Sequence, residues 1–188
     1  MSITDTPLLP GYPYHIYNRG LDKQTTFLEA RQYFSFLELM KKYFPQAYDV
    51  YAYCLLPNHF HIFLRVMNSN NKKPHLPQSH MINAYTQKFN RPLQRNGALF
   101  ERPFKRKKII NDQYSWQLVC YIHHNPYHHK IGNYKDYPWS SLKTFLSSKP
   151  TYINRKRVIA AFGSRDDFIS MHEQELDLRD IRDSLIEA

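Results

Sequence analysis

Four stretches of the chain are rich in the aromatic and β-branched residues that favour β-strands. They span residues 12–20, 48–56, 59–67 and 99–110. Pro57 and Asn58 separate the second stretch from the third and are typical turn residues, so these two strands are expected to pair as an antiparallel hairpin. The fourth stretch is basic, and Pro103 lies near its start, a position that suits an edge strand.

Between and after these stretches, apolar residues recur at helical spacing. The predicted helices cover residues 25–44, 78–91 and 112–124. In the first helix, Thr26 and Glu29 are expected to form a capping box, and Pro45 ends the helix. The resulting order is β-α-β-β-α-β followed by a further helix. This order predicts an α+β protein with a ferredoxin-like (split βαβ) antiparallel sheet, helices on one face of the sheet and an added helix.

The apolar pattern weakens toward the C-terminus. Residues 154–163 are expected to form a short helix that ends at Gly163, and residues 164–188 are polar and expected to be helical in pieces. We therefore predict a core domain, residues 1–150, followed by a helical C-terminal extension, residues 151–188.

Two histidines lie one residue apart in the third predicted strand, in the sequence PNHFHIFL. Side chains alternate between the two faces of a strand, so His59 and His61 point the same way while Phe60, Ile62 and Leu64 form the core face. Two imidazoles one pleat apart are well placed to share a metal ion. The pair alone is also compatible with a structural or solvated role.

Other metal sites that contain His-x-His fit this chain less well. Amidohydrolase-type sites use the motif on a much longer barrel chain, and 188 residues argue against that fold. A zinc site with Cys54 is disfavoured because the turn at residues 57–58 interrupts the strand alternation between this cysteine and the histidines.

A second group of functional candidates lies in the sequence CYIHHNP, residues 120–126. Tyr121 and Asn125 are four residues apart and therefore share a helix face, which would put a nucleophile beside a metal-ligating amide. Tyr121 also fits a plain packing stripe. Pro126 disfavours helical geometry at the preceding residue, so the helix either ends at His124 or carries Asn125 onward. His123 and His124 are further candidates for metal binding or proton transfer.

The charge of the chain favours an anionic partner. Lys and Arg total 26 against 16 Asp and Glu, which gives a formal net charge of +10. Such an excess is most often associated with nucleic acid, although basic faces can also simply aid solubility. The candidate DNA-binding residues are Asn18, Arg19, Lys23, Arg102, Lys105, Arg106, Lys107 and Lys108. On an alternating strand, only half of the basic run at 102–108 can share one face, and a solvated edge strand is the alternative interpretation.

The cysteines and the apolar runs bear on location. Only Cys54 and Cys120 occur, far apart in the sequence, which argues against a disulfide scaffold and fits a reducing cytosol. The first twenty residues lack the features of a signal peptide, and no run approaches 18 apolar residues. We expect a cytoplasmic protein with no membrane partner.

Four sequence blocks together resemble a known family. They are YHIYNRG at 14–20, AYCLLPNHFHIFL at 52–64, YIHHNP at 121–126 and YPWSS at 137–141. The chain resembles the Y1 HUH transposases of the IS200/IS605 type, and more closely the REP-associated tyrosine transposases, over roughly residues 12–146. The resemblance implies that His59 and His61 bind a divalent metal, Mg²⁺ or Mn²⁺, that Tyr121 on the added helix is the catalytic nucleophile, and that Asn125 is the third metal ligand.

The same resemblance implies a reaction and a substrate. The expected activity is metal-dependent nicking and rejoining of single-stranded or hairpin DNA through a 5′-phosphotyrosine intermediate, by a monomer rather than a homodimer and in association with the bacterial nucleoid. A non-catalytic protein that binds structured DNA or RNA is the main alternative. A phosphoesterase that uses water as nucleophile is a third interpretation.

Overall fold

The protein is described by a computed structural model that covers residues 6–68 and 73–174. The helical pieces predicted beyond residue 174 lie outside the described residues. None of the helices in the described ranges is long and apolar enough to cross a membrane.

The centre of the molecule is an antiparallel sheet in the order β2-β3-β1-β4. Its strands are β1 (Pro13–Arg19), β2 (Tyr48–Leu56), β3 (His59–Val66) and β4 (Lys105–Lys108). The predicted hairpin is confirmed as β2 and β3, joined at residues 57–58. The predicted fourth strand is shorter than expected, because only residues 105–108 pair with β1, while Phe100 makes an isolated bridge to Gly20. The split βαβ order predicted from the sequence is confirmed.

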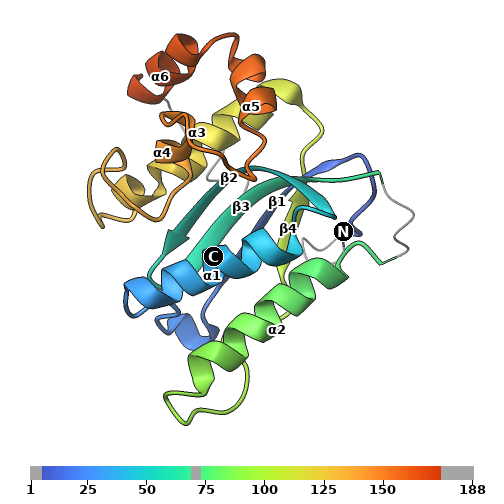
Figure 1. Ribbon diagram of the computed structural model, residues 1–188, viewed down its shortest axis with the longest axis vertical. Helices are drawn as coiled ribbons and strands as arrows, with labels where there is room; N and C mark the ends of the chain where they lie inside the picture. The colour runs from blue at the N-terminus through green and yellow to red at the C-terminus, as the bar shows by residue number, and fades with distance from the viewer. Residues whose placement is uncertain (1–5, 69–72, 175–188) are drawn as a thin grey trace.

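One face of the sheet is covered by α1 (Ala30–Tyr43) and α2 (Leu76–Asn90), which lie side by side (Figure 1). Phe36 and Tyr85 on these helices pack against each other, and Phe36 also packs against Phe60 of the sheet. The predicted capping box was displaced by three residues. Glu29 is the N-cap of α1 and exchanges hydrogen bonds with Gln32, so the helix begins later than the sequence suggested.

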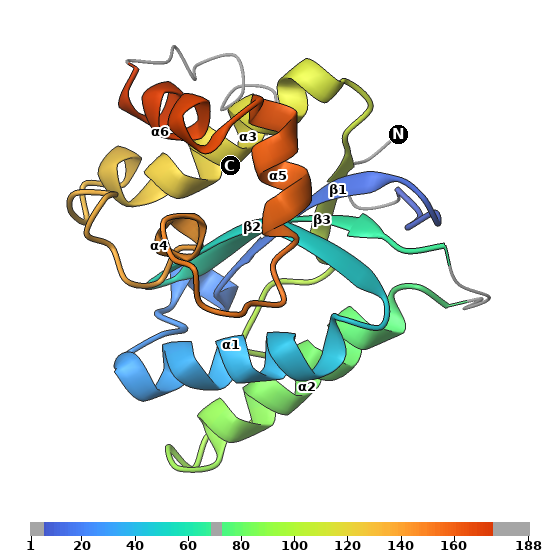
Figure 2. The same cartoon turned by 45° about the horizontal axis from the view of Figure 1, so that its top comes forward.

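The other face is covered by the added helix, α3 (Asp112–His128), and by the three helices that follow it (Figure 2). These are α4 (Leu142–Phe145), α5 (Arg155–Phe162) and α6 (Arg165–Glu173). Ile153 forms a bridge with Val50 of β2, and Phe168 of α6 is fully buried in the same core as the sheet. The division of the chain at residue 150 stays a prediction, but the described part of the extension packs on the core rather than away from it.

Candidate active site

The alternation predicted for β3 is confirmed by its packing. Phe60 and Ile62 are buried in the core on the side of α1 and α2. His59 and His61 point the opposite way, where their rings contact residues of the α3 segment. The pairing with β1 places His61 opposite Tyr17. The hydrophobic residues of β3 thus anchor the strand and direct both imidazoles to one end of the sheet.

A third histidine completes this group. The side-chain nitrogens of His59, His61 and His129 all lie within 4.8 Å of one another. His129 directly follows α3, and its Nε2 lies 3.3 Å from Nε2 of His59. Its backbone N–H donates to the carbonyl of Asn125 at 2.9 Å, which continues the helical path to this residue. His129 was not among the residues predicted from the sequence, although its position four residues after Asn125 places it on the same helix face.

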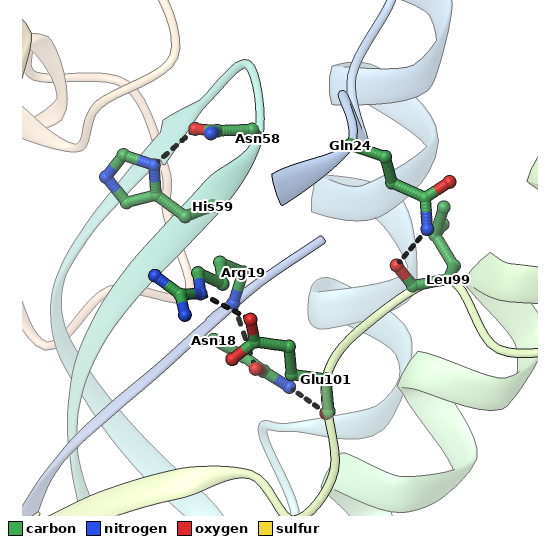
Figure 3. Close-up of polar contacts among 7 residues, drawn as sticks. All are labelled: Asn18, Arg19, Gln24, Asn58, His59, Leu99 and Glu101. Carbon is green, nitrogen blue, oxygen red and sulfur yellow. Dashed lines mark hydrogen bonds and ion pairs between the residues drawn. The ribbon is translucent and has the colours of Figure 1, made fainter. Parts of the chain in front are cut away.

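Neighbouring side chains orient the two strand histidines. Nδ1 of His59 lies 2.7 Å from Oδ1 of Asn58 (Figure 3), and Nδ1 of His61 lies 3.0 Å from Nε2 of His15. An amide oxygen only accepts, so His59 carries its hydrogen on Nδ1 and has a lone pair on Nε2. That is the tautomer a metal requires, held by the kind of outer partner that metal-ligating histidines use. The His61 ring is further held by stacking on His15 and Tyr17.

The helix α3 does not end at His124. It continues through Pro126 to His128, so the second of the two alternatives is correct. Proline has no N–H to donate to the carbonyl four residues earlier, which here is that of Ile122. The side-chain amide of Asn125 compensates, since its Nδ2 donates to the carbonyls of Tyr121 at 3.0 Å and Ile122 at 3.5 Å. These two bonds fix which way the amide points.

The oxygen of the same amide fits a metal ligand. Asn125 is fully buried, and its Oδ1 has no hydrogen-bond partner in the described part of the chain. A buried acceptor without a partner costs free energy and calls for an unseen one. Asn125 lies one helical turn from Tyr121 and one from His129, between two residues whose rings contact the strand histidines. The three imidazole nitrogens lie close together, and an amide oxygen is a type of donor that is compatible with the same divalent ion.

The predicted nucleophile lies beside this group but is covered. The Tyr121 ring meets the His61 ring edge-on, with 6.1 Å between their centroids, and His128 stacks on it at 5.8 Å. Tyr121 is 2% exposed, whereas His128 is exposed. The residues described around the neighbouring cleft do not include Tyr121. The phenol ring therefore contacts a candidate metal ligand but is not exposed to the cleft.

A cleft of about 380 Å³ lies in front of the histidines. It is lined by Tyr17, Asn18, Arg19, Lys23, Asn58, His59, Phe60, His61, Lys105 and His129. These described residues include no acidic side chain, but they include three cationic side chains, those of Arg19, Lys23 and Lys105. The surroundings of the histidine group therefore suit an anionic ligand.

The basic strand β4 divides its charges between the two faces of the sheet, as its alternation predicted. Lys105 pairs with Tyr17 and Lys107 with His15, so both lie on the histidine face. Arg106 and Lys108 point to the other face, where Lys108 lies over the ring of Tyr12 at 3.2 Å. Arg102 lies on that second side as well, in a groove beside Arg106.

Two of the predicted DNA-binding residues also hold the wall of the cleft. Asn18 is 2% exposed and donates from Nδ2 to the carbonyl of Glu101 at 2.8 Å. Arg19 forms an ion pair with the Glu101 carboxylate (Figure 3). Lys23 lies in the short 3₁₀ turn Leu21–Lys23 at the rim. Asn18 therefore has a structural role, and Arg19 and Lys23 are the more accessible of the three.

The remaining histidine candidates of α3 face away from the cleft. His123 contacts His172 of α6 and Ser141, and His124 contacts the backbone carbonyl of His172. Burial lowers the pKa of His123 well below its usual range and that of His124 to about 4. The structure does not bring either to the histidine group at the cleft. Cys54 pairs with His61 in the sheet but does not join that group either.

Comparisons with known proteins agree with the fold. No protein-family model matches the chain, and no curated protein is similar to it in sequence. Among solved structures, a similar fold is found in a chain that matches over 80% of this chain and 89% of its own, with a TM-score of 0.60 and 15% sequence identity. That structure is a REP-associated tyrosine transposase bound to a REP hairpin. The chain therefore has the α+β fold of a tyrosine transposase.

Proposed function

We propose that this protein is a metal-dependent endonuclease and strand-transferase for single-stranded or hairpin DNA, and that it belongs with the REP-associated tyrosine transposases. The observation that carries the proposal is the convergence of His59, His61 and His129 within 4.8 Å, with the ring of Tyr121 against His61. A metal-binding group in contact with a tyrosine, beside a basic cleft, suits cleavage of a phosphodiester by a phenolate.

In the proposed reaction, the Tyr121 oxygen attacks the phosphorus of the scissile phosphodiester. A bond forms between that oxygen and phosphorus, and the bond from phosphorus to the 3′ oxygen breaks. The phenol loses its proton, and the departing 3′ oxygen gains one to become a 3′-hydroxyl. The 5′ end of the DNA stays on Tyr121 as a phosphodiester, and attack by a second 3′-hydroxyl reverses the chemistry without ATP.

The metal is proposed to bind to His59, His61 and His129, with the Asn125 oxygen as a fourth donor. When bound, it would neutralise charge on the non-bridging phosphate oxygens. Mg²⁺ and Mn²⁺ were both expected from the sequence. Three imidazole nitrogens favour Mn²⁺ between these two, because Mg²⁺ prefers oxygen ligands.

The proposed substrate is DNA that is unpaired at the cut, beside a hairpin. Support comes from the cations at the cleft and from the structural neighbour, which is bound to a REP hairpin. An unpaired strand can turn its phosphate in line with the attacking oxygen, as a regular duplex cannot. We further propose that the protein acts as a monomer and works in the bacterial cytoplasm, in contact with the nucleoid.

One observation favours a second candidate, a non-catalytic protein that binds structured DNA or RNA. Tyr121 is 2% exposed and lies under His128, so the proposed enzyme requires the His128 ring to move before DNA reaches the phenol. A protein that only binds would not require that movement, and its affinity would not depend on the phenol oxygen.

Replacement of Tyr121 by Phe separates the two candidates. We expect wild type with Mn²⁺ and a labelled hairpin oligonucleotide to give a DNA-linked protein band on a denaturing gel, and Tyr121→Phe to give none. Tyr127→Phe is the matched control, since this exposed tyrosine lies on the same helix and should leave the band unchanged. Absence of the band from wild type, or a band of equal strength from Tyr121→Phe, would overturn the proposed enzyme.

A further inference from the structure

A fourth histidine, His15, lies on the same face of the sheet as the candidate metal-binding histidines. It belongs to β1, an inner strand that pairs with β3 on one side and with β4 on the other. His15 is opposite Phe63 and Lys107, two residues before Tyr17, so its side chain is on the histidine face. It is fully buried and is not among the described residues that line the cleft. Any role of His15 in the site must therefore act through a neighbouring side chain.

That neighbour is His61. Nε2 of His15 lies 3.0 Å from Nδ1 of His61, and both side chains are buried. The two ring planes are 10° apart and the ring centroids are 5.2 Å apart. At this N–N distance, such a centroid separation places both nitrogens between the ring centres, where the lone pair of one can accept from the N–H of the other. The contact is therefore a hydrogen bond between two imidazoles.

Tyr17 restricts the rotation of both imidazoles. Its ring centroid is 4.9 Å from that of His15, at an interplanar angle of 21°, and 5.9 Å from that of His61, at 13°. Three nearly parallel rings are thus in mutual contact on two paired strands. Because interiors of proteins are densely packed, this arrangement keeps the two nitrogens facing each other.

The direction of the hydrogen bond decides whether His61 can bind a metal. A neutral imidazole carries one N–H. If His15 donates from Nε2, the hydrogen of His61 is on its own Nε2, and that nitrogen cannot bind an ion. If His61 donates from Nδ1, its Nε2 has a lone pair for the group formed with His59 and His129. Only the second arrangement is compatible with a metal site.

This outer partner differs in kind from that of His59. The Asn58 oxygen, 2.7 Å from Nδ1 of His59, can only accept, so it selects the same tautomer with and without metal. An imidazole can accept or donate, so the pair of His15 and His61 has two arrangements with the same heavy-atom positions. A metal ion that binds only one of these arrangements shifts the population toward it.

We propose that His15 is a positioning residue for the metal: it accepts a hydrogen bond from Nδ1 of His61 and so directs the Nε2 lone pair of His61 toward the ion. This inference rests on the metal site of the proposed function. Outer partners of metal-ligating histidines contribute about 10- to 100-fold to metal affinity. His15 should therefore affect the affinity for the ion although it is not itself a ligand.

Two replacements separate the hydrogen bond from the packing. His15→Phe keeps an aromatic ring beside Tyr17 and His61 but removes the acceptor. His15→Gln removes the ring, but its amide oxygen can take the place of Nε2 as acceptor. In calorimetric titrations we expect His15→Phe to bind Mn²⁺ about 10-fold more weakly than wild type, and His15→Gln to lie within about 3-fold of wild type.

Phe63→Leu is the matched control, because this buried ring is opposite His15 in the sheet. It should lower the melting temperature, since it leaves a cavity, without a change in Mn²⁺ affinity. Wild-type Mn²⁺ affinity in His15→Phe would overturn the proposal. An affinity of His15→Gln as low as that of His15→Phe would also overturn it.

The tautomer of His15 is a second readout, and it requires only the wild-type protein. Long-range proton–nitrogen correlation spectra of protein with isotope-labelled histidine show which ring nitrogen carries the hydrogen. With Zn²⁺, a diamagnetic ion that imidazole binds well, we expect the hydrogens of His15 and His61 both on Nδ1. A purely structural His15 would not depend on this arrangement, and a hydrogen on Nε2 of His15 in the presence of Zn²⁺ would overturn the proposal.

The metal titration does not depend on DNA chemistry, so this proposal and the proposed enzyme can fail separately. A lower Mn²⁺ affinity in His15→Phe without any DNA adduct in wild type would contradict the enzyme and leave the role of His15 intact. An adduct in wild type together with an unchanged Mn²⁺ affinity in His15→Phe would do the reverse. Failure of wild type to bind Mn²⁺ and Zn²⁺ would contradict the metal site and the role of His15 together.

Discussion

Two groups of histidines lie on opposite sides of α3, and they differ in how their nitrogens are satisfied. At the cleft, Nε2 of His59 and Nε2 of His129 face each other at 3.3 Å. Between α3 and α6, His123 Nδ1 lies 2.8 Å from His172 Nε2, and His123 Nε2 lies 2.8 Å from Ser141 Oγ. The first group presents nitrogens to a basic cleft, whereas the second is closed within the protein.

The hydrogen-bond partners explain this difference. His172 Nδ1 donates to the Phe168 carbonyl at 2.7 Å, so its Nε2 accepts from Nδ1 of His123, and Nε2 of His123 accepts from the Ser141 hydroxyl. One backbone carbonyl thus fixes both neutral tautomers. At the cleft, His59 already donates from Nδ1 to Asn58, so its Nε2 bears a lone pair directed at another imidazole. The same residue type is therefore a structural link in one place and a candidate metal ligand in the other.

Removal of a cleft histidine should have the largest effect on function and little effect on stability. We expect His59→Ala to lower metal-dependent adduct formation by more than about 100-fold, because loss of a direct ligand costs more than loss of the outer partner that orients it. The melting temperature should stay close to that of wild type, since His59 is only partly buried. Adduct assays measure the loss of activity, calorimetric titration with Mn²⁺ measures metal binding, and thermal unfolding measures the melting temperature.

His80→Ala is the control for this change, because His80 is exposed on α2, away from the cleft. It should leave both the adduct and the metal titration unchanged. Undiminished metal binding by His59→Ala would show that the cleft group is not the metal site.

The closed group should instead make stability depend on pH. Burial lowers the pKa of His124 and of His172 to about 4, below the usual value of 6.5. The unfolded chain therefore binds protons first as the pH falls, and stability present above pH 6.5 is lost progressively between pH 6.5 and about 4. The loss should be of order 3 kcal/mol for each group, at about 1.4 kcal/mol per pKa unit, and less than twice that for the pair because the two rings interact.

Urea unfolding at several pH values between 6.5 and 5, above the usual range of carboxyl groups, measures this dependence. His172→Phe removes one titrating ring from an aromatic environment that includes Phe162 and Phe168. It should lower stability at pH 7, because His123 loses an acceptor, and should flatten the pH dependence. A slope as steep as that of wild type would show that the acid sensitivity originates elsewhere.

The sequence was sufficient to predict the order of strands and helices along the chain and the direction of His59 and His61, because strand alternation and helical spacing follow directly from the positions of apolar residues. It was not sufficient to assign roles among the histidines of α3. Pro126 leaves the end of the helix undetermined, and the helical phase beyond it decides which side His129 faces. The amide of Asn125, which donates to the carbonyls of Tyr121 and Ile122, carries the helix past this proline.

The other differences have one local cause and one long-range cause. The helix α1 begins at Ala30, with Glu29 as its N-cap, because the side chains of Glu29 and Gln32 satisfy each other's backbone groups. His123 and His124 became structural because α6 supplies His172, a partner some fifty residues away that no local pattern identifies. Long-range partners of this kind, rather than local propensity, decided which polar residues remained available for function.

Removal of His129 should have the smallest effect of these changes and is the sharpest test of the cleft group. This histidine is exposed and follows the end of α3, so His129→Ala should leave the fold intact. His59, His61 and the Asn125 oxygen would remain as ligands. Because His129 is exposed, a water molecule can take its place at the ion, so we expect the affinity for Mn²⁺ to fall only about 10-fold, less than for His59. The affinity for Mg²⁺ should fall less, because an imidazole contributes less to binding that ion, so the ratio of the Mn²⁺ affinity to the Mg²⁺ affinity should decrease.

His128→Ala is the matched control on the neighbouring residue, which contacts Tyr121 and is not one of the three candidate metal-binding histidines. Calorimetric titrations of the three proteins with each ion would contradict the three-histidine site if His128→Ala weakened Mn²⁺ binding as much as His129→Ala.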